Sequence, residues 1–429
     1  MSQPNAKNEF SLEIEALAYG PHGIGRIDKQ VVMIPGTVPG DKISARLTDS
    51  KGNYAVGEIV RLLQPSALRQ APPCPYVSHC GGCPWQQIQY HAQLQAKQQS
   101  VADALRRIGK LDDFELRPIL PAVHDYHYRR RIRLQLDSRK RLGFYRPSSH
   151  QLVEIDSCLI AAGPVNDCIP AVSNWVQPIH SPLAYVEIVA GDRPGEIVIV
   201  ARSRGDFFPD DEIACRQLLK EAPRIAGLIL AGRDWRRVWG ESRISITTEE
   251  DVCLPVEADV FTQVNSQGNR SIVRELLAAG QFKNDERVLE LYSGAGNFTL
   301  SVAKRVREVV AVEGHRPSVE SGKRSAQLNE LSNIRWLVSQ VPAAVKGLAK
   351  QRQNFSKIIL DPPRAGAKGI EAGLAALNSE KILYVSCNPA TLARDLAGLA
   401  KHGYKLRTVQ PIDLFPHTFH VETLAVMSR

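Results

Sequence analysis

Two segments of the sequence place reactive side chains directly after predicted strands. Cys387 follows the apolar strand 381–386, and Asp361 follows the apolar strand 358–360 and precedes two prolines. Short apolar runs between helical stretches are typical of parallel strands that are buried on both faces. Ligands of open α/β sheets bind at the carboxyl edge of such strands. We therefore expect Cys387 and Asp361 to lie at one edge of one sheet.

A cysteine at this position can act as a nucleophile, because its thiolate is reactive and nearby cations or helix N-termini favour that form. By residue type alone, Cys387 would instead be a small buried hydrophobe. One reaction that needs a thiolate nucleophile is methylation of uracil at carbon 5. That carbon is a poor nucleophile, and adding a thiolate at carbon 6 makes an enolate whose carbon 5 can attack a methyl donor. A general base must then remove the carbon 5 proton. Near the end of the sequence Glu422 is the candidate base, with His417 and His420 as competitors.

A turn that contains glycine indicates a nucleotide pocket beside these residues. The strand 288–291 runs into the turn 292–298, and Glu313 ends the next strand, nineteen residues after Gly294. Glycine lets a ligand approach the backbone closely, and the carboxylate can accept hydrogen bonds from ribose hydroxyls. Both a dinucleotide and S-adenosylmethionine fit this pattern. Thr299 stands where the dinucleotide fingerprint needs its third glycine, which favours S-adenosylmethionine.

A second group of cysteines lies far from Cys387 in the sequence. Cys74, Cys80 and Cys83 have the spacing C-x5-C-x2-C, and Cys158 is the candidate fourth ligand. Four thiolates can hold either tetrahedral zinc or an iron-sulfur cluster, and the spacing does not decide between them. A radical S-adenosylmethionine enzyme would need C-x3-C-x2-C, so the first gap argues against that class.

The pattern of elements predicts a multidomain α/β protein with three regions. Residues 1–66 alternate short β-type runs with Gly and Pro turns, which predicts a small, oligonucleotide-binding-type barrel of about five strands. Residues 67–260 contain the cysteine group, a helix over 88–110 that can pack on the catalytic domain, and then a mainly β region. Residues 261–429 alternate helices with apolar strands, which predicts a doubly wound, Rossmann-like sheet.

The charge favours a polyanionic partner, because 54 Lys and Arg outnumber 45 Asp and Glu and give a net charge of +9. Arg and Tyr concentrate over 126–146, and in the strand 131–136 the basic and amide side chains alternate with apolar ones, which predicts an RNA-binding face. The sequence lacks a long apolar run, and residues 1–9 lack the features of a secretory signal. These features predict a cytoplasmic protein without membrane contact, and we expect it to act as a monomer.

Several segments together resemble the RNA 5-methyluridine methyltransferase family, and residues 1–66 resemble a TRAM domain, an RNA-binding barrel. The segments are 261–265, 291–298, 361–364, 386–389 and 420–422. The resemblance covers essentially the whole chain and implies Cys387 as nucleophile and Glu422 as base. It also implies that a set of six side chains surrounds S-adenosylmethionine: Gln263, Tyr292, Asn297, Glu313, Gln340 and Asp361.

Cysteines in this pattern bind a [4Fe-4S] cluster in the ribosomal-RNA branch of that family. The resemblance therefore implies a [4Fe-4S] cluster on Cys74, Cys80, Cys83 and Cys158. Because the transfer-RNA members are expected to lack both the barrel and the cysteines, it also implies 23S ribosomal RNA as the substrate. The alternatives are methylation of transfer RNA, a dinucleotide oxidoreductase, and a non-catalytic RNA-binding iron-sulfur protein, which leaves Asp361, Cys387 and Glu422 unexplained.

Overall fold

The computed structural model describes residues 9–248 and 252–429, and its first element is a closed barrel. The barrel strands are β1 (Glu9–Leu17), β2 (His22–Ile27), β3 (Gln30–Pro35), β4 (Lys42–Lys51) and β5 (Tyr54–Gln64), in the order β1-β2-β3-β5-β4. Successive residues of a strand face opposite sides, so Leu12 and Ile14 of β1 are buried while Ser11 and Glu13 are exposed. The predicted barrel is confirmed.

A seven-stranded sheet forms the middle of the chain, in the order β13-β12-β11-β10-β7-β8-β9. Its elements are β7 (Arg131–Leu136), β8 (Leu142–Tyr145), β9 (Leu152–Glu154), α2 (Gly163–Asn166), α3 (Ile169–Trp175), β10 (Leu183–Ala190), β11 (Ile197–Ser203), α4 (Asp211–Glu221), β12 (Gly227–Ala231) and β13 (Arg236–Gly240). Helices α3 and α4 bury one face through Trp175 and Leu218. The short pair β14 (Arg243–Thr247) and β15 (Cys253–Glu257) packs on the other face.

Two of the basic residues near the start of β7, Arg130 and Arg131, do not lie on the predicted RNA-binding face. Arg130 is buried, and its guanidinium donates to the carbonyl oxygen of Gln263 at 2.8 Å and pairs with Asp192 at 3.1 Å. Arg131 donates to the carbonyl oxygen of Val260 at 2.9 Å. A guanidinium removed from water must find acceptors within the protein. Both side chains therefore fasten the middle sheet to the segment that enters the carboxyl-terminal region, and the RNA interpretation is wrong for them.

The carboxyl-terminal sheet has the order β18-β17-β16-β19-β20-β22-β21-β6. Its strands are β6 (Glu115–Leu116), β16 (Arg287–Leu291), β17 (Glu308–Glu313), β18 (Ile334–Val338), β19 (Lys357–Leu360), β20 (Lys381–Ser386), β21 (Lys405–Ile412) and β22 (Glu422–Ser428). Strands β16 to β20 are mutually parallel, and β22 inserts antiparallel between β20 and β21. The strand order reverses between β16 and β19, which is where open α/β sheets bind ligands. The predicted doubly wound sheet is confirmed.

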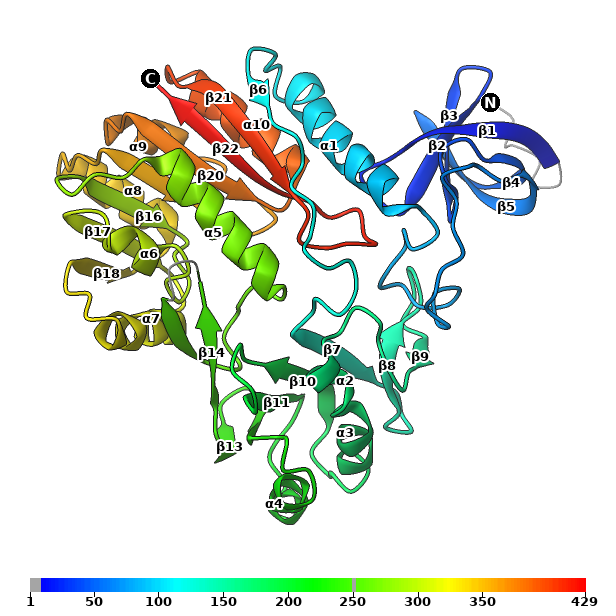
Figure 1. Ribbon diagram of the computed structural model, residues 1–429, viewed down its shortest axis with the longest axis horizontal. Helices are drawn as coiled ribbons and strands as arrows, with labels where there is room; N and C mark the ends of the chain where they lie inside the picture. Colours follow the sequence, from blue (N-terminus) through cyan, green and yellow to red (C-terminus); the bar gives the residue numbers. More distant parts are fainter. Residues whose placement is uncertain (1–8, 249–251) are drawn as a thin grey trace.

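Helices cover both faces of this sheet (Figure 1). One face carries α1 (Tyr90–Arg107), α8 (Val341–Lys350), α9 (Glu371–Ala376) and α10 (Pro389–Ala400), and the other carries α5 (Ser266–Gly280) and α6 (Thr299–Ala303). Helix α7 (Arg316–Leu328) packs against β15 and β18. Although α1 precedes the middle sheet in sequence, its Val101 and Leu105 belong to the core of the carboxyl-terminal region.

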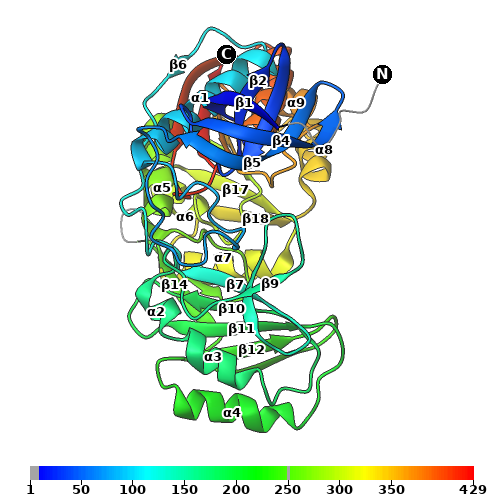
Figure 2. The same cartoon turned by 90° about the vertical axis from the view of Figure 1, so that its right-hand side faces the viewer.

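The barrel lies close to the carboxyl-terminal sheet, and α1 runs between the two (Figure 1). Figure 2 shows the barrel in front of that sheet, and the seven-stranded sheet with α4 at the other end of the molecule. No helix within the described ranges is long and apolar enough to cross a membrane.

Candidate active site

Cys387 and Glu422 meet because their strands are neighbours in the sheet. Strand β20 pairs antiparallel with β22, and Ser386 lies opposite Thr423. The next residues in this register are Cys387, which follows β20, and Glu422, which opens β22. Both side chains therefore stand at the carboxyl edge of the parallel strands, where the ligand site is expected. Sequence alone could not give this register.

The nucleophile candidate stands between the end of a strand and the start of a helix. The side chain of Asn388 accepts hydrogen bonds from the backbone N–H groups of Ala390 at 3.0 Å and Thr391 at 3.4 Å, and Pro389 occupies the first turn of α10. Asparagine at an N-cap and proline at the first helical position are favoured starts of a helix. Cys387 thus lies beside a helix N-terminus, whose partial positive charge favours a thiolate.

Burial dominates the protonation of this site. Burial, and after it the charge of Asp361, raise the pKa of Glu422 to about 8. Burial, and after it the charge of Glu422, raise the pKa of the Cys387 thiol to about 11, and burial raises the pKa of Asp361 to about 7. Arg364 counteracts the shifts of Cys387 and Glu422. In the free protein the thiol is therefore protonated at neutral pH, and Arg364 is the cation that favours the thiolate.

Arg364 was not predicted to have a separate role in the site. It follows the Asp-Pro-Pro segment after β19, and its guanidinium lies 3.5 Å from Nε2 of His420. The main-chain oxygen of Arg364 accepts a hydrogen bond from the Thr391 hydroxyl at 3.2 Å. Its position directly after the predicted strand-end motif was the available signal, because a cation there faces the same sheet edge as Cys387.

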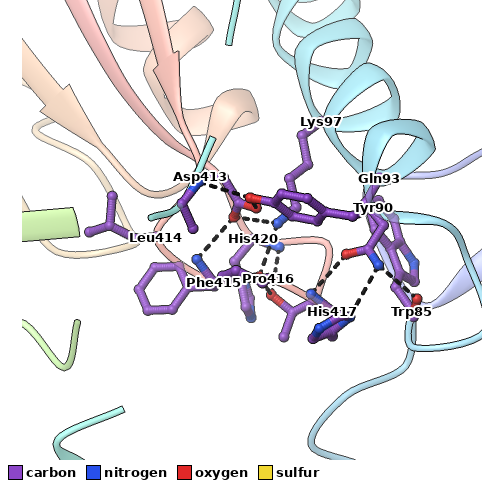
Figure 3. A network of polar contacts seen from close by, with 12 residues as sticks. Trp85, Tyr90, Gln93, Lys97, Asp413, Leu414, Phe415, Pro416, His417 and His420 are labelled. Atoms are coloured by element: carbon purple, nitrogen blue, oxygen red, sulfur yellow. Dashed lines mark hydrogen bonds and ion pairs between the residues drawn. The ribbon is translucent and has the colours of Figure 1, made fainter. Parts of the chain in front are cut away.

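The two histidines that competed with Glu422 are weaker bases. Burial, and after it the charge of Arg364, lower the pKa of His420 to about 4. Burial lowers the pKa of His417 to about 4, and its ring stacks on Tyr126 with 4.3 Å between centroids. The backbone N–H of His417 donates to Oε1 of Gln93 in α1 at 2.8 Å, and Nδ1 of its ring lies 3.1 Å from Nε2 of Gln93 (Figure 3). Glu422 is thus the stronger base of the three, and its catalytic role stays a prediction.

The glycine turn that is predicted to bind a nucleotide follows β16. Oε2 of Glu313 accepts from the Gly294 N–H at 3.0 Å, and Oε1 accepts from the His315 N–H at 2.7 Å. These bonds fix the carboxylate over the turn. Tyr292 has a φ of 63°, a left-handed backbone that is uncommon for a residue other than glycine. A left-handed tyrosine at a strand end marks a sharply bent turn, which is a common feature of ligand sites.

The remaining predicted cofactor residues lie around that turn. Asn297 forms two reciprocal amide hydrogen bonds with Asn269 of α5, at 2.8 and 2.9 Å. The amide of Gln340 lies over Gly314, so close that a Cβ there would be 2.9 Å from Nε2. Asp361 follows β19, and its N–H donates to the Leu291 carbonyl oxygen at 3.4 Å. Close to the same turn, the buried Ser293 hydroxyl has no hydrogen-bond partner among the described residues.

Gln263 stands on the segment that leads into α5. Its carbonyl oxygen accepts a hydrogen bond from Arg130 at 2.8 Å. The neighbouring Asn265 caps α5 by accepting from the Gly268 N–H at 2.9 Å. The segment is therefore anchored on both sides of Gln263.

The structure brings the four cysteines of the second group into one region. Burial, with smaller contributions from the charges of Cys158 and Cys80, raises the pKa of Cys83 to about 12. Burial also raises the pKa of Cys80, with smaller effects from Cys158 and Cys74. Gly81 touches the β8–β9 hairpin, where an added Cβ would be 3.1 Å from the Tyr145 carbonyl oxygen. Among the described residues, no group of three or more Cys, His, Asp or Glu is arranged to hold a single metal ion.

Known proteins share both the barrel and the carboxyl-terminal region of this chain. The model of the tRNA (Uracil-5-)-methyltransferase family matches residues 243–429, and the TRAM domain model matches residues 8–60. The solved tRNA (uracil-54, C5)-methyltransferase of Pyrococcus abyssi, in complex with S-adenosyl-L-homocysteine, has a TM-score of 0.75 at 23% identity and covers 97% of this chain and 100% of that chain. The fold and the family model together define a methyltransferase.

Relatives along the whole chain define the family more narrowly. The 23S rRNA (uracil(1939)-C(5))-methyltransferase RlmD of Vibrio parahaemolyticus is 32% identical, with 100% of this chain and 99% of the relative covered. An uncharacterized RNA methyltransferase of Synechocystis is also 32% identical over 97% of this chain and 95% of its own length. This chain belongs to the family of RNA (uracil-C5)-methyltransferases that includes RlmD.

One expectation from the sequence needs correction. The P. abyssi enzyme is named as a tRNA methyltransferase, yet its fold covers 97% of this chain, including the region of the barrel. The expectation that transfer-RNA members lack the barrel is therefore wrong. A barrel alone does not separate ribosomal from transfer RNA as substrate, because a fold can serve several substrates.

Proposed function

We propose that this protein transfers the methyl group of S-adenosylmethionine to carbon 5 of a uridine in 23S ribosomal RNA, at the position that corresponds to uracil 1939 in the named relatives. The observation that carries the reaction is the adjacency of Cys387 and Glu422 at the end of paired strands β20 and β22. The support for the substrate is the 32% identity to RlmD over the whole chain.

In the proposed reaction, the Cys387 thiol gives its proton to solvent water, and its sulfur forms a bond to carbon 6 of the uracil. The electrons of the carbon 5–carbon 6 double bond move toward the oxygen on carbon 4, and carbon 5 then takes the methyl group from the donor. The Glu422 carboxylate removes the proton from carbon 5, the double bond forms again, and the sulfur leaves as a thiolate. Arg364 favours the anionic sulfur at the start and at the end.

The methyl donor would lie at the switch point between β16 and β19. We assign its ribose to Glu313, whose carboxylate is already fixed over the glycine turn. The other proposed contacts are Gln263, Tyr292, Asn297, Gln340 and Asp361. S-adenosylmethionine supplies only the methyl group, and these side chains determine where its sulfur points.

We also propose that Cys74, Cys80, Cys83 and Cys158 hold a [4Fe-4S] cluster. Each thiolate of such a cluster binds a different iron, so the four sulfurs stand farther apart than around one zinc ion. Four neighbouring cysteines without a single-ion geometry are compatible with the larger group. The cluster would order the loop and take no part in methyl transfer, because that reaction moves no electrons between redox centres.

The deciding experiment uses 23S RNA that carries 5-fluorouridine. A fluorine on carbon 5 cannot leave as a proton, so a nucleophile that has added to carbon 6 stays attached. With S-adenosylmethionine present, the wild-type protein should give a covalent adduct on a denaturing gel, and Cys387→Ala should give none. Cys253→Ala, a substitution on β15 away from the site, is the matched control and should behave as the wild type.

The same assay separates the candidate substrates. An adduct with transfer RNA and none with 23S RNA would retain the chemistry and overturn the proposed substrate. No adduct with either RNA would overturn the enzymatic proposal and favour an RNA-binding iron-sulfur protein.

A further inference from the structure

The loop between β1 and β2 of the barrel reaches the active site. The hydroxyl of Tyr19 donates a hydrogen bond to the main-chain oxygen of Cys387 at 2.9 Å, although the two residues are 368 positions apart. The Tyr19 ring meets Phe419 edge to face, with 5.5 Å between centroids and 82° between planes. It also packs against the hydrophobic core of the carboxyl-terminal region.

We propose that Tyr19 is a positioning residue for Cys387, so that the catalytic site is complete only when the barrel is docked. The inference rests on the proposed function and deepens it. The carbonyl that Tyr19 holds belongs to the peptide between Cys387 and the N-cap of α10. Fixing that peptide fixes the direction of the Cα–Cβ bond and hence the position of the sulfur.

The neighbourhood of the Tyr19 hydroxyl supports this role. The groups that affect its protonation, after burial, are Cys387, Arg364 and Glu422, so the phenol lies beside the proposed catalytic set. Burial raises the Tyr19 pKa above its usual range, so the hydroxyl keeps its proton and serves as a donor at every ordinary pH. A neutral donor to the backbone can orient the nucleophile without competing with Glu422 for the substrate proton.

A second contact holds the same loop. The indole N–H of Trp85 donates to the carbonyl oxygen of Gly20 at 3.2 Å, and Trp85 is fully buried. Gly20, the residue next to Tyr19, is thereby attached to the segment that follows Cys83. The barrel loop is held at two consecutive residues, which is the rigid support that a positioning side chain needs.

The test compares full-length Tyr19→Phe with the wild type. The variant keeps the ring and its packing on Phe419 and loses only the hydroxyl. We expect the first-order rate of adduct formation at saturating 5-fluorouridine RNA to fall roughly fivefold, the effect of one net hydrogen bond in the transition state. The RNA dissociation constant and the melting temperature should stay at the wild-type values. Tyr54→Phe, at the start of β5 on the barrel, is the matched control and should change none of these quantities.

Two results would overturn the inference. The first is a wild-type rate for Tyr19→Phe at saturating RNA, and the second is a change confined to the RNA dissociation constant, which would make Tyr19 an RNA contact. If the wild type forms no adduct, the proposed function has failed. The rate of Cys387 alkylation by iodoacetamide in the free protein, followed by peptide mass spectrometry, then decides: a slower or faster rate in Tyr19→Phe supports positioning, and equal rates overturn it.

Discussion

Glu422 shows how a single residue in this site is set by its surroundings. It is 4% exposed, and burial with the nearby charge of Asp361 raises its pKa to about 8 from an ordinary 4.5. A carboxylate with so high a pKa is a strong base, which suits the removal of a proton from carbon. The same burial makes the ionised form costly. Arg364 is the cation that limits this cost. Both residues should therefore affect how the reaction depends on pH.

Glu422 should control both product release and stability against pH. Because only the ionised form accepts a proton, release of the methylated RNA from the Cys387 adduct should rise with pH through about 8. Glu422→Gln should accumulate a methylated adduct on unmodified RNA, measured on a denaturing gel at single turnover. A variant that released product at the wild-type rate would exclude Glu422 as the base.

The stability effect has the opposite sign. The pKa of Glu422 is raised in the folded state, so its contribution is fully present below the unfolded pKa of 4.5 and is lost as pH rises through about 8. Glu422→Gln removes this loss. Its free energy of unfolding relative to the wild type, measured by urea denaturation, should therefore be higher at about pH 9 than at about pH 5, by an amount on the order of a few kcal/mol or less.

Arg364 should control how readily Cys387 ionises. Its guanidinium lowers the pKa of Cys387 against burial and Glu422, so Arg364→Gln should raise that pKa further. We expect adduct formation near neutral pH to slow about fivefold to tenfold, and the pH profile of Cys387 alkylation to move upward. Lys368→Gln, an exposed cation on the same loop, is the control. Equal shifts in both variants would mean that only net charge matters.

At the scale of elements, the strands that carry the site were predictable and their pairing was not. The apolar runs at 358–360 and 382–385 are strands β19 and β20, because such runs can only be satisfied inside the sheet. Nothing in the sequence near Glu422 says that β22 inserts beside β20 and not at the edge, since strand pairing depends on long-range packing. The place of Cys387 was therefore predictable, and the adjacency of Glu422 was not.

Helix α1 supports the segment that precedes Glu422. Nζ of Lys97 pairs with Asp413 at 2.6 Å, and both side chains are fully buried (Figure 3). The same Nζ donates to the carbonyl oxygen of Phe415 at 2.9 Å, and Tyr90 donates to Asp413 at 2.9 Å. A helix from the cysteine-bearing part of the chain thus fixes the loop between β21 and β22.

Breaking that ion pair from one side should be costly. Lys97→Met leaves Asp413 buried without its cation, and we expect a loss of about 3–5 kcal/mol in the free energy of unfolding, measured by urea denaturation. Arg107→Met on the same helix removes an exposed pair with Asp103, 3.6 Å apart, and should change the free energy by less than about 0.5 kcal/mol. Similar losses in the two variants would contradict the view that a buried ion pair is more costly to break from one side than an exposed one.

At the scale of the whole molecule, three distant segments are joined by hydrogen bonds, and one of them contacts Cys387. The barrel contributes Tyr19, the segment after the cysteines contributes Trp85, and the loop before β22 contributes His417, whose carbonyl oxygen accepts from the Trp85 N–H at 3.0 Å. Each region could be predicted from its own local pattern of residues. Their contacts could not, because no periodicity links residues hundreds of positions apart. The active site therefore depends on contacts between regions that are distant in the sequence.

This arrangement predicts what loss of the cysteine group would do. Cys83 precedes Trp85 by two residues, so a disordered cysteine loop would release both the Gly20 and the His417 contacts. We expect Cys80→Ser to lose bound iron and sulfide, to lower the melting temperature, and to slow adduct formation about tenfold or more, because misplacement of catalytic groups is costly.

Affinity for S-adenosyl-L-homocysteine should stay within about twofold in Cys80→Ser, because most of the proposed cofactor residues belong to strands β16 to β19 and their turns, and the cysteine loop does not support them. Cys253→Ser is the matched control and should keep the iron, the melting temperature and the rate. If Cys80→Ser instead left folding, RNA affinity and turnover unchanged, the cysteine group would have no part in ordering the site. A loss of adduct formation with unchanged cofactor affinity would mean that the cysteine loop, through Trp85, holds the barrel and the loop before β22 in the positions that Cys387 needs.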